Sequence, residues 1–176
     1  MSIDFFVVPT VRFKVLFVLV ILAHHRRRVV HFNVTEHPTA QWTAQQIIEA
    51  FPWDTAPKYL LRDRDGTYGS QFQRRVESMG IEEVITAPRS PWQNAFVERV
   101  IGSIRRDCLD HIVVLNDRHL KRALTNYLKY YHSWRTHLSL EMDSPDSRPV
   151  QLPPLGKVVQ FPEVGGLHHH YERMAA

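Results

Sequence analysis

The chain has 176 residues and a mass of 20.6 kDa, and 44% of its residues are hydrophobic while 23% are charged. This balance is typical of one globular domain, which at this size buries about 68 to 70% of its unfolded surface. Cys108 is the single cysteine, so a disulfide scaffold and a cysteine-rich zinc module are excluded, and a reducing, cytoplasmic location is expected. The formal net charge of +4 permits a polyanionic partner such as nucleic acid without proving one.

The longest apolar run, VLFVLVILA, lies between Lys14 and His24 and is far shorter than the roughly 20 residues that a membrane span requires. The chain opens Met-Ser-Ile-Asp and continues after this run with HHRRR. A signal peptide needs a basic start and a small-residue cleavage site. The sequence therefore predicts no membrane association.

Residues 3–34 are dense in Val, Ile, Leu and Phe, with breaks at Pro9 and at HHRRR. This pattern predicts three consecutive strands, buried on both faces as in the centre of an α/β sheet. Thr39 is predicted to cap a helix that ends near Phe51. The inward-facing positions of that helix are expected to be Ala40, Ala44, Ile47, Ile48 and Phe51.

Strands and helices are predicted to alternate further along the chain, with a strand at 59–63, a helix at 71–79 ended by Gly80, and a strand at 83–86. After a Pro-Arg-Ser-Pro loop, one face of the next helix carries Val97, Ile101, Ile104 and Cys108. Asn116 or Asp117 is expected to cap the last helix. Its buried stripe is predicted to comprise Leu120, Ala123, Leu124, Tyr127, Leu128, Tyr131 and Trp134.

The composition changes at Asp143 to the proline-rich segment SPDSRPVQLPP, which forbids a regular helix. We therefore predict a domain over 1–142 and a linker and C-terminal tail over 143–176. The histidines at 168–170 and the pair His24 and His25 are expected to be solvated, since adjacent imidazoles seldom converge on one zinc ion.

Three carboxylates carry the chemistry that the sequence suggests. Asp4 lies within an apolar strand, where an unpaired charge costs several kcal/mol unless it is paired or binds a cation. Asp63 ends a predicted strand, at the edge where open α/β sheets place their sites, and Glu98 lies on the helix after the loop. Oxygen ligands without His or Cys partners favour Mg²⁺ or Mn²⁺ over zinc. A pair of such ions would serve phosphoryl transfer.

The segments around these carboxylates resemble a known family. Asp4 lies in an apolar first strand, Asp63 in LLRDRDG, and Glu98 in SPWQNAFVER, and the downstream segments are YLKYYHSWRTHLSL and DSPDSRP. This pattern, with 35 residues from Asp63 to Glu98, is similar to the Asp, Asp, Glu core of retroviral-integrase-like transposases from bacterial insertion sequences. The resemblance covers about 3–150.

The resemblance implies an α/β, RNase H-like fold, with a mixed central sheet of about five strands flanked by helices. It implies two Mg²⁺ or Mn²⁺ ions held by Asp4, Asp63 and Glu98, and metal-dependent cleavage and transfer of DNA strands during transposition. The implied partners are the DNA of the element ends and of the target, with a homo-oligomer as the active form and no small-molecule substrate.

Two features depart from the family pattern. Family members usually carry a helix-turn-helix region before the core, whereas the first carboxylate here is residue four, so an N-terminally truncated core is expected. Ala95 stands where the family most often has Gly, and alanine would be strained in a left-handed backbone conformation.

Alternatives stay open at several positions. Asp65 competes with Asp63, and is expected instead to shape the Asp-Gly turn. The fold could persist as a non-catalytic remnant that binds DNA or dimerises, or could serve an RNase H-type nuclease. The expected DNA contacts are Asn94, Trp92, Arg99, Arg105 and Arg106. Asn94 could instead cap the Glu98 helix, and Trp92 could instead pack against the domain. The three arginines could instead form a solvated face. Arg135 and His137 are expected to tie the last helix to the core.

Overall fold

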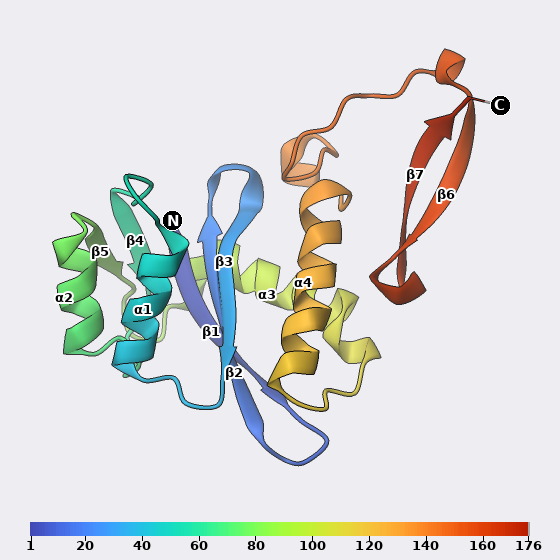
Figure 1. Cartoon of the computed structure of the whole chain (residues 1–176). Coiled ribbons are helices and arrows are strands. Elements are labelled where there is room, and N and C mark those ends of the chain that lie inside the picture. The colour runs from blue at the N-terminus through green and yellow to red at the C-terminus, as the bar shows by residue number, and fades with distance from the viewer. Residues whose placement is uncertain (176) are drawn as a thin grey trace.

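The computed structural model describes residues 1–175 and contains a five-stranded mixed sheet with helices on both faces (Figure 1). The strand order is β3-β2-β1-β4-β5. β1 pairs antiparallel with β2, and β2 with β3, whereas β1 pairs parallel with β4, and β4 with β5. The strand bounds are β1 Ser2–Pro9, β2 Val15–Ala23, β3 Arg28–Thr35, β4 Tyr59–Arg62 and β5 Glu82–Ile85. The predicted α/β class and all five predicted strands are confirmed.

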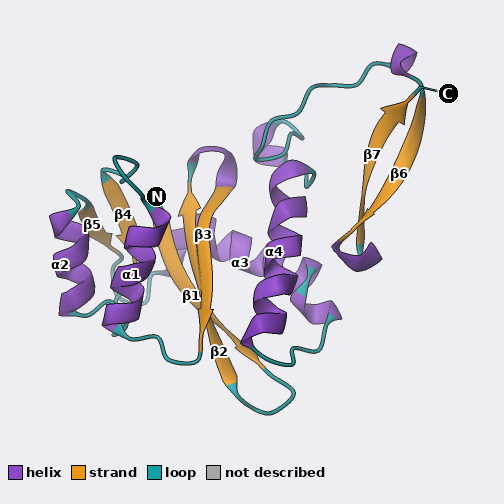
Figure 2. Ribbon diagram, in the orientation of Figure 1, coloured by secondary structure: helices purple, strands orange, loops and turns teal. Residues whose placement is uncertain are grey.

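Alternation of side chains along β1 divides the core into two layers. Ile3 lies in one cluster with side chains of α1 (Ala40–Ala50) and α2 (Ser70–Ser78). Phe6 and Val8 lie in the other, with side chains of α3 (Ala95–Asp107) and α4 (Asp117–Ser133). Figure 2 shows α1 and α2 together on one side of the molecule and α4 on the other. Both faces of the sheet are therefore covered, as the apolar strands predicted.

Local signals in the sequence set the helix ends. Thr39 Oγ1 accepts a hydrogen bond from the Trp42 backbone N–H at 3.2 Å, which confirms it as the cap of α1. Asn116 caps α4 by accepting from the His119 N–H at 2.8 Å, which decides between the two candidates. Gly80 follows α2 with φ +71°, the left-handed conformation that glycine adopts most easily.

The predicted apolar stripes are largely confirmed. Val97, Ile101, Ile104 and Cys108 are all buried between α3 and the sheet. On α1, Ala44, Ile47 and Phe51 are buried, but Ile48 is 37% exposed and its predicted inward position is wrong. The buried members of the α4 stripe are Leu120, Leu124, Tyr127, Leu128 and Tyr131, whereas Ala123 and Trp134 are half-buried. None of the helices within 1–175 combines the length and hydropathy needed to cross a bilayer.

The C-terminal segment differs from the expected solvated tail. β6 (Lys157–Glu163) and β7 (His168–Met174) form an antiparallel hairpin after the proline-rich linker. His168 stacks on Tyr130 of α4 with ring centroids 4.6 Å apart, and His170 stacks on Trp134 at 3.8 Å. The prediction that the histidines are solvated is wrong for His168 and His170, because Tyr130 of α4 and Trp134 just after it offer flat surfaces that the two imidazoles cover. The domain boundary at residue 142 stays a prediction.

Candidate active site

The parallel pairing of β1 with β4 brings two of the three carboxylates together. Ser2 of β1 pairs with Leu61 of β4. Because side chains repeat every two residues along a strand, one step further on both chains leads to Asp4 and Asp63 on the same side of the sheet. This side faces α3, the helix that carries Glu98.

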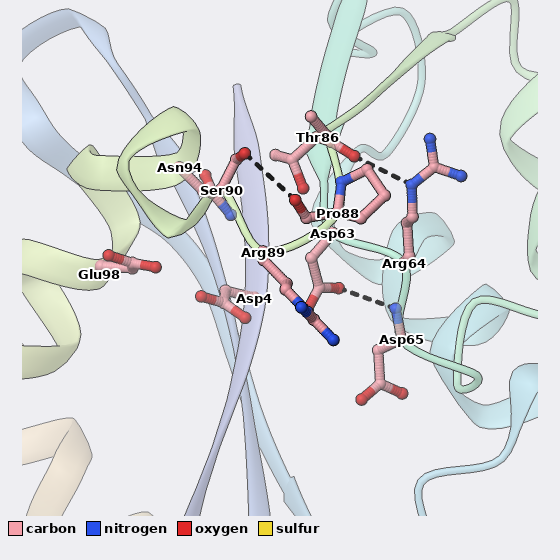
Figure 3. A pocket seen from close by; sticks show the side chains of 11 residues that line it. Asp4, Asp63, Arg64, Asp65, Thr86, Pro88, Arg89, Ser90, Asn94 and Glu98 are labelled. Carbon is pink, nitrogen blue, oxygen red and sulfur yellow. Dashed lines mark hydrogen bonds between the residues drawn. The ribbon is translucent and has the colours of Figure 1, made fainter.

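The three predicted carboxylates line one pocket of about 410 Å³, together with Asp65 and Asn94. Figure 3 shows Asp4 on its strand between Glu98 of α3 and Asp63 at the end of β4. Glu98 lies in the first turn of α3, where the helix dipole favours a negative charge. The structure thus brings Asp4, Asp63 and Glu98 to one site from three elements.

Burial dominates the electrostatics of Asp4. Desolvation and, to a smaller extent, the charges of Asp63, Glu98 and Asp65 together raise the pKa of this carboxyl group to about 7, against the opposing hydrogen bond from the Phe5 N–H. The Phe5 N–H donates to Asp4 Oδ1 at 2.8 Å and so stabilises the ionised form of this carboxyl group. Asp4 is therefore a carboxylate whose negative charge is poorly compensated by the protein itself.

Asp63 and Asp65 differ in their roles at the end of β4. Asp65 Oδ1 accepts a hydrogen bond from the Thr67 N–H at 2.8 Å, so Asp65 shapes the Asp-Gly turn as predicted. Asp63 Oδ1 accepts from the Asp65 N–H at 3.1 Å, which fixes its carboxylate beside Asp4 in the pocket. The side chain of Asp65 also lines the pocket.

Asn94 is a pocket residue and not a cap. Its side chain makes no capping hydrogen bond to α3, so that predicted alternative is wrong. Its Nδ2 donates to the Ile3 carbonyl oxygen at 3.3 Å, which fixes the helix start against β1. Its Oδ1 is buried and has no hydrogen-bond partner within residues 1–175, although Asn94 is only 4% exposed. A buried acceptor without a partner costs free energy, so this oxygen is available to a ligand in the pocket.

The donor set of this pocket fits a hard divalent cation. It supplies carboxylate oxygens and one amide oxygen, which Mg²⁺ and Mn²⁺ prefer, and both Asp4 and the orphaned Asn94 Oδ1 would gain from a positive charge. Across the described part of the chain, no three His, Cys, Asp or Glu side chains form a tight cluster of metal ligands. A bound cation would therefore have to draw the three carboxylates closer together.

The predicted DNA-contact residues separate onto different surfaces. Arg105 donates to the Val7 carbonyl oxygen at 3.3 Å and lies over the Phe6 ring, on the β1 side of α3. Arg99 and Arg106 line a different pocket. Trp92 is 70% exposed, so the interpretation that it packs back onto the domain is wrong.

The loop before α3 forms the third wall of the carboxylate pocket. Its backbone is held by the Ala87 N–H, which donates to Gln93 Oε1 at 2.7 Å. Arg89 lines the pocket with φ +56°, a left-handed conformation that is uncommon for a residue other than glycine. Ala95 has φ −55° and ψ −27°, ordinary helical values, so alanine causes no strain there.

Sequence reasoning missed Tyr68. This residue is 3% exposed beneath the site, its ring lies 5.9 Å from that of Phe5, and its hydroxyl has no hydrogen-bond partner among the described residues. Burial raises its pKa well above the ordinary value, and the charges of Asp4 and Asp63 add to this effect. Tyr68 follows the Asp-Gly turn and belongs to no periodic apolar stripe, so no pattern in the sequence indicated it.

Arg135 ties the end of α4 to α3, as predicted. Its Nε donates to Asp107 Oδ2 at 2.9 Å, and its guanidinium also donates to Ser103 Oγ at 3.3 Å. His137 packs edge-on against Tyr131, with ring centroids 4.9 Å apart. Its backbone N–H donates to the Asp143 carbonyl oxygen at 3.0 Å, so both residues hold the chain after α4 in place.

A mixed five-stranded sheet of this order, covered by helices on both faces, is an RNase H-like fold. Solved structures of retroviral integrases have the same fold. A chain of the simian T-cell lymphotropic virus intasome, solved with the PP2A regulatory subunit B56 gamma, aligns with 97% of this chain at a TM-score of 0.64 and 17% identity. The HTLV-2 integrase catalytic core domain in complex with magnesium aligns with 82% of this chain and 90% of its own length, at a TM-score of 0.59 and 14% identity.

The sequence comparisons agree with the fold. Residues 79–145 match the family model of the integrase core domain. InsK of Escherichia coli (strain K12), assigned as a transposase for insertion sequence element IS150, is 25% identical over 116 residues, which are 64% of this chain. The chain spans 41% of the length of InsK and 64% of the intasome chain. The predicted resemblance to integrase-like transposases is confirmed, and the similarity is to their core.

Proposed function

We propose that the chain is the catalytic core of a transposase that cleaves DNA strands and transfers them to a target with the help of two divalent metal ions. The observation that carries this proposal is the convergence of Asp4, Asp63 and Glu98 on one pocket. The match of residues 79–145 to the integrase core domain supports it, since that segment includes Glu98. The similarity to InsK supports transposition as the process.

In this proposal Asp4, Asp63 and Glu98 hold two Mg²⁺ or Mn²⁺ ions. Such ions activate an attacking oxygen and stabilise the leaving oxygen at a phosphodiester. Asp63 is oriented by the Asp65 N–H, and Asp4 by the Phe5 N–H. These contacts orient the two aspartates in the pocket, and cation binding would still have to draw the three carboxylates closer together.

The DNA itself is proposed to meet the surface around this pocket. Arg105 lies on the same face of α3 as Glu98, seven residues further on, where its guanidinium can bind a phosphate. Trp92 is exposed next to the pocket loop and offers a stacking surface for a base. Asn94 would offer its Oδ1, a buried hydrogen-bond acceptor, to the DNA that enters the pocket. We further propose that the active form is a homo-oligomer bound to the element ends and the target.

One observation favours a second candidate function. The carboxylates do not form a tight ligand cluster within residues 1–175, as expected of a non-catalytic remnant that binds DNA or dimerises. The two functions differ in metal binding. The remnant would bind DNA without taking up metal at the carboxylate pocket, and its DNA affinity would not depend on Asp63 or Glu98.

Calorimetric titration with Mn²⁺ tests the proposal. The parent protein should bind Mn²⁺, and Asp63→Asn and Glu98→Gln should each weaken binding at least tenfold. Glu82→Gln removes an exposed carboxylate from β5 and should leave Mn²⁺ binding unchanged. If both pocket variants titrate like the parent, the metal site is assigned to the wrong residues.

Strand transfer is the second readout. The substrate is a pre-processed DNA end, and placement of its scissile phosphate near the attack geometry supplies about 7 to 11 kcal/mol. Fusing a helix-turn-helix domain before Ile3 should raise the Mn²⁺-dependent activity, and Asp4→Asn should abolish it. Activity that survives Asp4→Asn would contradict the two-metal mechanism, and a folded, inactive fusion would favour the remnant.

A further inference from the structure

A second pocket, of about 390 Å³, adjoins a face of α3 different from the one that carries Glu98. Three separate parts of the chain build it: the turn between β2 and β3, the helix α3, and the end of α4 together with the segment that follows it. We call it the arginine pocket, and the residues that matter for its chemistry are Arg27, Phe96, Arg99, Arg106, Arg135 and His137.

Helix geometry separates this pocket from the carboxylates. Phe96, Arg99, Ser103 and Arg106 follow one another at intervals of three, four and three residues, so they share one face of α3. Glu98 precedes Arg99 by one residue and therefore points about 100° away around the helix axis. One rigid helix thus presents a carboxylate to one pocket and two guanidinium groups to the next.

Among the described arginines of the arginine pocket, only Arg135 pairs with a carboxylate, that of Asp107. None of its described lining residues is acidic. The neighbouring Asp107 already accepts hydrogen bonds from Arg135 Nε at 2.9 Å and from the Tyr127 hydroxyl at 3.1 Å. Arg99 and Arg106 are exposed and form no ion pair within residues 1–175. Their guanidinium donors are free to meet an anion.

Arg27 is held in place without a carboxylate partner. Its guanidinium lies 3.9 Å from the centroid of the Phe96 ring, and its Nη1 donates to the His24 carbonyl oxygen at 2.6 Å. Two contacts of this kind fix the side chain while leaving its charge uncompensated. An arginine positioned in this way loses little conformational freedom when an anion binds.

His137 adds an unsatisfied polar atom to the same pocket. Its Nε2 is buried and has no hydrogen-bond partner among the described residues. Burial, together with the charges of Arg135 and Arg27, lowers the pKa of His137 to about 4, so the imidazole is neutral at pH 7. A buried nitrogen without a partner beside Arg27, which has no carboxylate partner among the described residues, is the arrangement expected of a pocket that a polar ligand completes.

We propose that the arginine pocket binds phosphodiester groups of DNA and so holds the strand in register with Glu98 on the same helix. This inference rests on the proposed function, because it takes the DNA of the strand-transfer reaction as the ligand. Arginine forks match the geometry of phosphate oxygens, and contacts to phosphates fix the register of a protein on DNA without reading its sequence.

DNA binding measured without metal tests the proposal. Fluorescence anisotropy of a labelled 20-base-pair duplex is followed in EDTA from 50 to 300 mM NaCl, with the full chain. The double variant Arg99→Gln, Arg106→Gln should bind more weakly, and the slope of log affinity against log salt should become shallower by about 2 because two phosphate contacts are lost. Both side chains are exposed, so the fold should be retained, as circular dichroism would show.

Two further variants sharpen the result. The matched control Arg118→Gln, Arg122→Gln removes the same charge from exposed positions near the start of α4 and should keep the slope of the parent. The charge-preserving variant Arg99→Lys, Arg106→Lys should keep the slope but weaken binding, because lysine cannot form the bidentate contact. Equal losses in the control and in the glutamine variant would overturn the proposal, because binding would then depend on net charge alone.

Two other measurements complete the test. The first shows whether the arginine pocket binds DNA phosphates or free inorganic phosphate, and the second shows whether the pocket binds DNA even if the proposed catalytic function fails. Inorganic phosphate is titrated in place of DNA; tight binding of phosphate combined with an unchanged DNA slope in the glutamine variant would overturn the proposal. Mn²⁺ titration of the same variant should match that of the parent. If the parent binds no Mn²⁺ while the slope still changes as expected, the catalytic proposal fails and the arginine pocket stands.

Discussion

The burial of Asp4 predicts that this residue destabilises the metal-free protein at neutral and alkaline pH. Its pKa rises from 3.8 to about 7 on folding, chiefly through desolvation. Each unit corresponds to about 1.36 kcal/mol, so the whole shift corresponds to about 4 kcal/mol. The remaining contact of the carboxylate with solvent screens part of this cost, and we expect Asp4→Asn to raise the free energy of unfolding at pH 8 by about 2 to 4 kcal/mol.

Proton binding by Asp4 sets the direction in which the stability of the parent changes with pH. Below about pH 4 the Asp4 carboxyl group is protonated in the folded protein and in most of the unfolded protein. The parent and Asp4→Asn should therefore be almost equally stable there. Between about pH 4 and pH 7 the folded state holds a proton that the unfolded state has lost, so the stability of the parent falls as the pH rises. Asparagine removes this dependence, and its Oδ1 can still accept the hydrogen bond of the Phe5 N–H.

Urea denaturation in EDTA at several pH values between 4 and 8 measures the effect. Asp65→Asn is the matched control, because Asp65 is exposed and asparagine keeps the oxygen that accepts from the Thr67 N–H; its effect should be near zero at every pH. Adding Mg²⁺ at pH 8 should stabilise the parent more than Asp4→Asn. A difference between parent and Asp4→Asn that does not change with pH would refute the argument.

Three other predictions concern stability and DNA binding. Tyr68→Phe should leave the metal-free protein as stable as the parent or more stable, because it deletes a buried hydroxyl without a partner among the described residues. Tyr127→Phe should lower the free energy of unfolding by about 1 kcal/mol in thermal or urea unfolding, because the Tyr127 hydroxyl donates to Asp107. The opposite order of stabilities would contradict the hydrogen-bond assignment. Arg135→Gln should cost about 1 to 3 kcal/mol in urea unfolding by breaking the pair with Asp107, while the exposed change Arg118→Gln costs almost nothing. Trp92→Ala should leave the melting temperature unchanged, since the side chain is 70% exposed, but should weaken single-stranded DNA binding in anisotropy measurements; a lower melting temperature would mean that the indole packs on the protein.

The sequence by itself determined the elements and the chemistry of the candidate active site. Apolar runs separated by turn residues predicted the first three strands, and Thr39 marked the start of α1, because these signals act between residues close in the chain. The three carboxylates were also evident, since a charged residue within an apolar strand and an acidic residue at a strand end are visible without a structure.

The tertiary structure decided what depends on contacts between distant segments. Asn94 turned from a capping candidate into a pocket residue because its amide meets the Ile3 carbonyl oxygen across 91 residues. His168 and His170 of the C-terminal hairpin are stacked because Tyr130 of α4 and Trp134, which follows this helix, lie against them.

The arginine pocket is the clearest case of a feature that only the tertiary structure decides. Arg27, Arg99 and Arg135 lie in different parts of the sequence, and no pattern in the sequence indicates that they meet. Packing of α3 between β2 and the end of α4 brings them to one pocket. Periodicity and capping report the preferences of a segment for its own conformation, whereas the neighbours that surround a charge are set by the way in which the apolar faces of distant segments pack together.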